Sequence, residues 1–215
     1  MTLSMKEKID MARLVRLTLF TITIMLTTVS VSVASSPRDR IESLNATLLE
    51  IMQNADELGY AGRYEKLQPV MTQLYDFGLM SRIAVGVYWK KLAPEQQKQL
   101  TEAFSRMSIA TYAARFDGYS GETFEIVSAE KSVRDTMLVK TRLIKSDGSP
   151  VALNYLTRPS GEDWRIIDVF LDARFSELAR LRADYTAVIK RQGFDSLLST
   201  IEAKIAENAE TVRRR

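Results

Sequence analysis

Residues 137–171 set the architecture of this chain and read MLVKTRLIKSDGSPVALNYLTRPSGEDWRIIDVFL. Apolar and polar residues alternate here with a period of two, which is typical of half-buried strands. The turn-forming runs at 146–148 and 160–163 divide the stretch into three strands. Phe124 and Ile126 show the same alternation just upstream. Four strands joined by short loops predict an antiparallel meander with one buried face.

Helical periodicity surrounds this meander on both sides. Apolar residues recur at steps of three and four, which predicts amphipathic helices. The expected helices cover Pro37 to Leu58, Glu65 to Tyr75, Phe77 to about Leu92, Pro94 to about Phe116, and Phe175 onward with a break at Gly193 and a last helix from Asp195 to Ala209. We therefore expect an α+β fold, with helices packed on one face of a four-stranded antiparallel sheet and a single domain over residues 35–210.

Composition narrows the possible chemistry. The 215 residues include 30 Lys and Arg and 27 Asp and Glu, and both signs are mixed along the chain. This distribution does not indicate a nucleic-acid-binding protein, which concentrates basic residues on one face. Histidine and cysteine are both absent, which excludes disulfides, thiol nucleophiles, Cys/His zinc sites and Ser-His-Asp relays. No cofactor and no metal are expected.

The first 34 residues have the pattern of an export signal. Four basic residues precede an uncharged run over 17–34, in which 11 of 18 residues are apolar and 7 are Ser or Thr. Small residues at Ser32 and Ala34 favour cleavage after Ala34. The alternative is an uncleaved signal that anchors the chain in the inner membrane, although its hydroxyls weaken it as a span. Both interpretations export the rest of the chain, which ends in a basic tail at residues 211–215.

Two carboxylates leave open the possibility that the chain is an exported enzyme. Asp168 and Asp172 are four residues apart at the end of the last predicted strand, and paired carboxylates can act as general acid and base. On one strand they would lie about 13 Å apart, which is far for action on one bond. The structural interpretation is that Asp172 caps the following helix while Asp168 pairs with an arginine. Asp117 and Tyr119 remain further candidates for such an enzyme.

An apolar set between the two layers is the candidate binding site. Its members would face one another across a wedge between helices and sheet, although the same pattern also describes an ordinary filled core. On the helical side they are Phe77, Met80, Ile83, Val87, Tyr88, Tyr112, Phe116 and Tyr119, and on the sheet they are Val139, Leu143, Leu153, Tyr155, Ile167 and Val169.

Several short motifs carry a family resemblance. They are DFGLMSRIA at 76–84, YW at 88–89, LAPEQQ at 92–97, TYAARFDGYSGE at 111–122 and WRIIDV at 164–169. In this order they resemble the toluene-tolerance (MlaC-like) family of periplasmic lipid-binding proteins, over about Ile41 to Ile205. The run from Arg115 to Glu122 and the Ser-Glu-Leu at 176–178 look most similar to the hopanoid-biosynthesis-associated HpnM branch.

The resemblance implies a function that the periodicity alone does not give. It implies a non-enzymatic periplasmic carrier that holds phospholipid or hopanoid-type lipid tails in the apolar set. Such a carrier shuttles lipid between an inner-membrane ABC-type transporter and an outer-membrane lipoprotein complex. A membrane-tethered scaffold for hopanoid synthesis or export is the alternative. Arg82, Arg115 and Arg174 are candidates for a phosphate or a partner surface.

One stretch departs from the family pattern. Family members typically carry glycine after the last strand, whereas this chain has Asp-Ala-Arg-Phe at 172–175. The resemblance therefore implies nothing about the turn geometry there.

Overall fold

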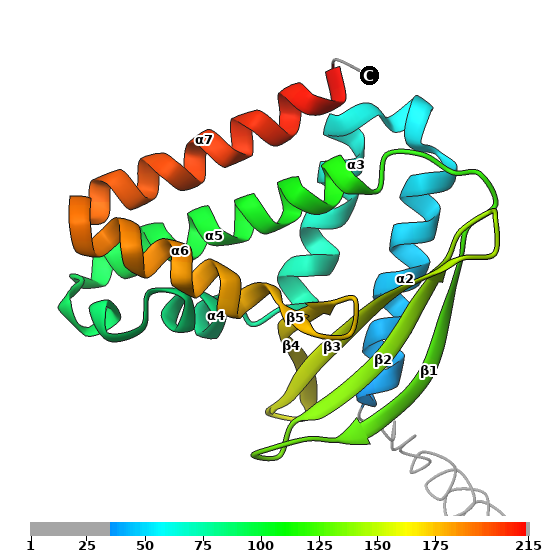
Figure 1. The fold of residues 1–215 in the computed structure, drawn as a ribbon, viewed down its shortest axis with the longest axis horizontal. Coiled ribbons are helices and arrows are strands. Elements are labelled where there is room, and N and C mark those ends of the chain that lie inside the picture. The colour runs from blue at the N-terminus through cyan, green and yellow to red at the C-terminus, as the bar shows by residue number, and fades with distance from the viewer. Residues whose placement is uncertain (1–34, 214–215) are drawn as a thin grey trace, which may run out of the picture. The chain divides into compact units, whose positions relative to one another are not determined.

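The computed structural model describes residues 35–213 (Figure 1). The predicted signal at 1–34 and the end of the basic tail at 214–215 lie outside the described residues. The last helix continues to Arg213, beyond its expected end at Ala209, so most of the expected tail is helical.

Two helices begin the described chain, α2 (Pro37–Gln53) and α3 (Ala55–Leu74). The Ser36 hydroxyl accepts from the Asp39 backbone N–H, and the Asp39 carboxylate accepts in return from the Ser36 N–H. This reciprocal cap fixes the start of α2. Sequence punctuation predicted a separate helix from Glu65. The structure instead continues α3 through that point and bends it at Gly59, whose φ of 57° is accessible to glycine.

Three helices lie between α3 and the sheet in the sequence. They are α4 (Phe77–Val85), the 3₁₀ helix η1 (Gly86–Lys91) and α5 (Pro94–Arg115). The Asp76 carboxylate accepts from the Leu79 N–H at 2.9 Å and caps α4. The helix expected to run to about Leu92 changes to 3₁₀ geometry at Gly86, whose φ is 55°.

The predicted meander is confirmed, with one short strand added. The sheet order follows the chain and every neighbouring pair is antiparallel. The strands are β1 (Thr123–Lys131), β2 (Met137–Ile144), β3 (Pro150–Ser160), β4 (Asp163–Leu171) and β5 (Phe175–Ser176). The chain returns to pair as β5 because Asp172 and Ala173 both adopt left-handed backbone angles, with φ of 48° and 60°. Such a turn directs the chain straight back along β4.

A bulge in β4 changes which residues face the helices. Thr157 pairs with Ile166 and Leu156 pairs with Asp168, so Ile167 is an extra residue on β4. An extra residue reverses the alternation of faces along a strand. Ile166 is therefore fully buried and Ile167 is only half-buried. Simple alternation predicted Ile167 on the inner face, and the bulge places Ile166 there instead.

The chain ends in a helical hairpin, α6 (Glu177–Gln192) and α7 (Phe194–Arg213). Gly193, with φ of 85°, makes the turn between them. Helices α2, α3, α4 and α6 contact the sheet, while α7 packs along α5. Figure 1 shows α6 and α7 joined at one end and diverging from it, with α5 between them.

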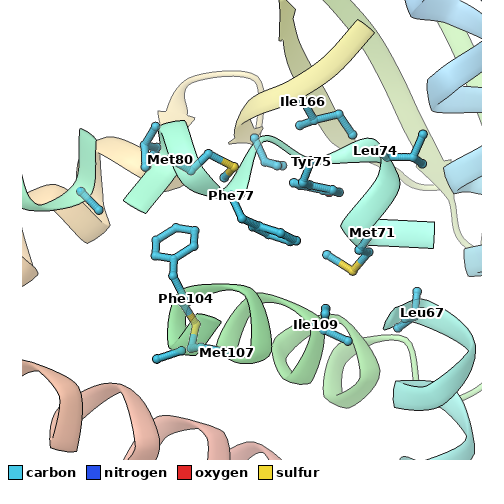
Figure 2. Close-up of a cluster of buried hydrophobic side chains, with 14 of the residues drawn as sticks. Leu67, Met71, Leu74, Tyr75, Phe77, Met80, Phe104, Met107, Ile109 and Ile166 are labelled. Carbon is cyan, nitrogen blue, oxygen red and sulfur yellow. The ribbon is translucent and has the colours of Figure 1, made fainter. Parts of the chain in front are cut away.

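The core lies where α3, α4, α5 and β4 meet. In Figure 2 the Phe77 ring of α4 lies between Met71 of α3 and Met80 of α4, and the Phe104 ring of α5 lies beside it. Ile166 of β4 closes this cluster from the sheet side. Arg63 of α3 is also buried, and it contacts α5 at Ala113.

Candidate functional site

A cavity of about 520 Å³ lies between α5, the α6–α7 hairpin and the inner face of β3 and β4. Its volume falls within the range of about 300–1,000 Å³ that is common for ligand pockets. The lining is largely apolar in its interior, with Met107 from α5, Leu153 from β3 and Val169 from β4 among the residues that form it.

One stripe of α5 forms an entire side of the cavity. The residues on it are Phe104, Met107, Ser108, Thr111, Tyr112 and Arg115. Steps of three residues and of one residue alternate between them, which places them on one face of a helix. At 1.5 Å per residue, the stripe from Phe104 to Arg115 is about 16 Å long. The cavity is therefore elongated along α5.

The α6–α7 hairpin supplies the opposite wall. Its apolar contribution comes from Leu178, Leu181, Tyr185 and Val188 on α6 and Ile201 on α7. The steps of three and four between the α6 residues are those of an amphipathic helix. The sequence showed this periodicity but did not assign it to a site, because the hairpin follows the sheet and its partner face was unknown.

Charged residues of α6 and α7 border the cavity on the side where the two helices diverge. Arg180 forms ion pairs of 3.0 Å with both Glu177 and Asp184 along α6, and Lys204 forms one of 2.9 Å with Glu207 along α7. All five residues line the cavity. Among the described residues, no ion pair joins α6 to α7. The rim is therefore polar and hydrated, whereas the interior is apolar.

Tyrosines provide buried polar groups close to the sheet. The Tyr75 hydroxyl donates to the Tyr112 hydroxyl at 2.8 Å, and both residues line the cavity. Tyr155 of β3 is fully buried beside them and does not line it. Burial raises the pKa of all three phenols well above the ordinary value of 10.0. They are thus neutral hydrogen-bonding groups.

Asp168 has a structural role rather than the paired role considered from sequence. Its carboxylate accepts from the Ser176 hydroxyl at 2.6 Å and from the backbone N–H groups of Val169 and Leu178 at 2.8 and 3.1 Å. Burial raises the pKa of Asp168, and these three hydrogen bonds oppose that rise. The expectation that Asp172 caps the next helix and that Asp168 pairs with an arginine is wrong. Ser176 is the N-cap of α6, and Asp168 supports it.

The structure divides the fourteen residues proposed from sequence into three groups. Those that line the cavity are Met80, Tyr112, Phe116, Leu153 and Val169. Those that are buried in, or packed against, the surrounding core are Phe77, Ile83, Tyr88, Val139, Leu143 and Tyr155. Those outside both groups are Val87 at 72% exposed, Tyr119 at 44% exposed and Ile167 at the bulge.

Of the three candidate arginines and the further enzyme candidates Asp117 and Tyr119, only one residue lines the cavity. Arg115 lines the cavity, whereas Arg82 and Arg174 do not. Asp117 and Tyr119 lie in the loop between α5 and β1 and do not line the cavity either. The structure therefore does not bring the candidate carboxylates together in this cavity.

No helix within residues 35–213 combines the length and the apolar character needed to cross a membrane. Over the same part of the chain, no group of three or more acidic side chains is placed to hold a metal ion.

Comparison with known proteins gives a family and a related fold. The family described as MlaC protein matches residues 42–203. A solved phospholipid-binding protein from Ralstonia solanacearum, in complex with a phospholipid, has a similar fold with a TM-score of 0.71. The two sequences are 20% identical, and the match covers 81% of this chain and 99% of that one. No curated protein sequence matches this chain.

Proposed function

This chain belongs to the MlaC family, and we propose that it is a periplasmic carrier that holds lipid tails in the cavity between α5, the α6–α7 hairpin and the sheet. The observation that carries this proposal is the elongated apolar cavity of about 520 Å³ with a charged rim. The phospholipid bound by the Ralstonia solanacearum protein, which has a similar fold, supports it.

The energetics of hydrocarbon in water explain why a carrier is needed. Moving one methylene group from an apolar environment into water costs about 0.8 kcal/mol. A 16-carbon chain would therefore cost roughly 13 kcal/mol if it crossed the periplasm uncovered. A cavity lined by Leu153, Val169 and the α6 residues removes much of that cost. Binding of this kind needs neither a nucleotide nor a metal in the carrier itself.

The charged rim suits the other end of a lipid. The charged, exposed residues at the edge of the cavity, among them Arg115, Arg180 and Lys204, would keep a zwitterionic or anionic head group hydrated. Because no ion pair described here crosses from α6 to α7, a lipid can enter between these helices without breaking one. Gly193, at the turn between α6 and α7, is the candidate hinge for separating the two helices.

Two finer parts of the proposal rest on the sequence. The basic and apolar segment at 1–34 supports export to the periplasm. The motif at 115–122, similar to the HpnM branch, favours hopanoid-type lipid as cargo in place of, or beside, glycerophospholipid. In this proposal the carrier exchanges lipid with an inner-membrane ABC-type transporter and an outer-membrane lipoprotein complex.

Native mass spectrometry tests the proposal directly. The full chain would be expressed in a Gram-negative host, recovered from the periplasmic fraction and analysed before and after solvent extraction. We expect about one lipid per protein, and transfer of that lipid to acceptor vesicles. A lipid-free protein that co-purifies with membrane partners would instead identify a scaffold. Substrate turnover that disappears in Asp168→Asn, with the fold retained, would identify an enzyme.

A further inference from the structure

The three tyrosine hydroxyls at the cavity carry more donor protons than the hydrogen bonds found among them use. Tyr75, Tyr112 and Tyr155 carry three hydroxyl protons, and the hydrogen bond between Tyr75 and Tyr112 uses one of them. The Tyr155 hydroxyl is buried and completes no hydrogen bond of good geometry. Even a contact between Tyr112 and Tyr155 would use only one more proton. At least one donor therefore remains without an acceptor, and a buried polar group in that state is costly.

Arg115 lies next to this cluster along α5. It follows Tyr112 by three residues, so both side chains lie on one face of the helix, about 4.5 Å apart along its axis. Arg115 is exposed at the edge of the cavity, and no ion pair described in residues 35–213 involves it. Its charge is close enough to the Tyr112 hydroxyl to affect that group's pKa. This end of the cavity thus combines a neutral donor with an unpaired cation.

We propose that Tyr112 and Arg115 form the head-group end of the cavity, where the Tyr112 hydroxyl donates to an ester carbonyl and the Arg115 guanidinium binds the phosphate of a glycerophospholipid. This inference rests on the proposed function and adds the two residues that recognise the ester and phosphate groups of the lipid. A carbonyl acceptor satisfies the surplus donor, and guanidinium is well suited to phosphate. The tails then extend along the α5 stripe from Tyr112 towards Phe104, a distance of about 12 Å, and reach Tyr185.

The ester carbonyl is tested by a pair of lipids that differ only there. Delipidated protein would be mixed with vesicles containing equal amounts of diester and diether phosphatidylcholine with the same 16-carbon chains. Native mass spectrometry then gives the ratio of the two bound lipids. We expect the wild-type protein to prefer the ester by about 2- to 10-fold, the range given by one neutral hydrogen bond.

Two variants of matched size assign the preference to Tyr112. Tyr112→Phe is expected to bring the ester-to-ether ratio to one. Tyr185→Phe removes a hydroxyl from the Phe104 end of the same cavity and is expected to keep the wild-type ratio. Arg115→Gln is expected to weaken the binding of both phospholipids by a similar factor, so that the ester-to-ether ratio is retained. Binding of a diacylglycerol with the same chains, which has no phosphate, is expected to stay unchanged.

The outcomes separate this inference from the proposed function. A wild-type protein that binds both lipids equally would overturn the inference and leave the carrier proposal intact, because a water molecule would then satisfy the tyrosines. A wild-type protein that binds neither lipid and also leaves the periplasm without any bound lipid would overturn the carrier proposal. The wild-type ratio needs no variant, so the test stands even where Tyr112→Phe fails to fold. If Arg115→Gln weakens the binding of diacylglycerol as much as that of the two phospholipids, Arg115 does not bind phosphate.

Discussion

Narrowing the cavity from its sheet side is expected to block lipid binding without unfolding the protein. Leu153 of β3 lines the cavity and is 8% exposed. Leu153→Trp adds about six heavy atoms, which occupy the space of about four to six methylene groups of a bound tail. At about 0.8 kcal/mol for each methylene, the lost binding free energy is roughly 3–5 kcal/mol, which weakens lipid binding by roughly 10²- to 10⁴-fold.

Val139→Trp is the matched control for stability. Val139 of β2 is also on the inner face of the sheet, but it is fully buried in the core and does not line the cavity. Inserting a large side chain into a filled core costs about 1–3 kcal/mol or more. Leu153→Trp should lie within about 1 kcal/mol of the wild type, because the existing space accommodates the ring.

Both quantities are measured on delipidated protein. Urea unfolding gives the free energy of unfolding, and titration with phospholipid vesicles followed by native mass spectrometry gives the bound fraction. The reasoning is refuted if Leu153→Trp destabilises the protein as much as Val139→Trp and still binds lipid. That result would mean that the sheet side of the cavity is closed in solution and that lipid binds elsewhere.

Three further predictions concern the scaffold. Arg63 donates from Nε to the Ala113 carbonyl and from Nη1 to the Ala55 carbonyl, both at 2.9 Å. Arg63→Met should therefore lower the free energy of unfolding by about 2–4 kcal/mol in a urea titration. An unchanged urea midpoint would show that water replaces these hydrogen bonds. Ala173→Gly should raise the free energy of unfolding by about 0.5–1 kcal/mol, because Ala173 has a φ of 60°, and a decrease would show that the turn is unstrained. The raised pKa of Asp168 means that the folded state binds its proton more tightly than the unfolded state. The stability of the wild type relative to Asp168→Asn should therefore increase as the pH falls through the raised pKa towards 3.8, whereas a relative loss over that window would contradict the burial of this carboxylate.

Local sequence signals predicted most of the fold because their causes are local. The Asp76 side chain caps α4 from three residues away. The turn at 146–148 and the period-two alternation define the strands on either side of it. The bulge at Ile167 and the short strand β5 had no such signal. Both depend on how β4 pairs with its neighbours, which a single strand does not encode.

The site was harder to predict for a related reason. Periodicity identifies the buried face of a helix but not what that face meets. Leu153 and Val139 share one pattern and one face of the sheet, yet only Leu153 borders the cavity. Leu181 and Val188 of α6 showed the right spacing, but nothing local indicated that their helix diverges from α7 and leaves space over α5. A cavity is a property of three elements together, and the family resemblance, not the pattern, pointed to one.

Photocrosslinking from the lipid tail tests the central claim most directly. A phospholipid with a diazirine at the end of one acyl chain would be loaded into the full chain and irradiated, and the labelled residues would be mapped by peptide mass spectrometry. We predict labels on cavity-lining residues such as Met80, Leu153 and Val188. Labels confined to exposed apolar residues such as Val87 and Val133, both 72% exposed, would contradict a lipid-binding cavity between α5 and the α6–α7 hairpin.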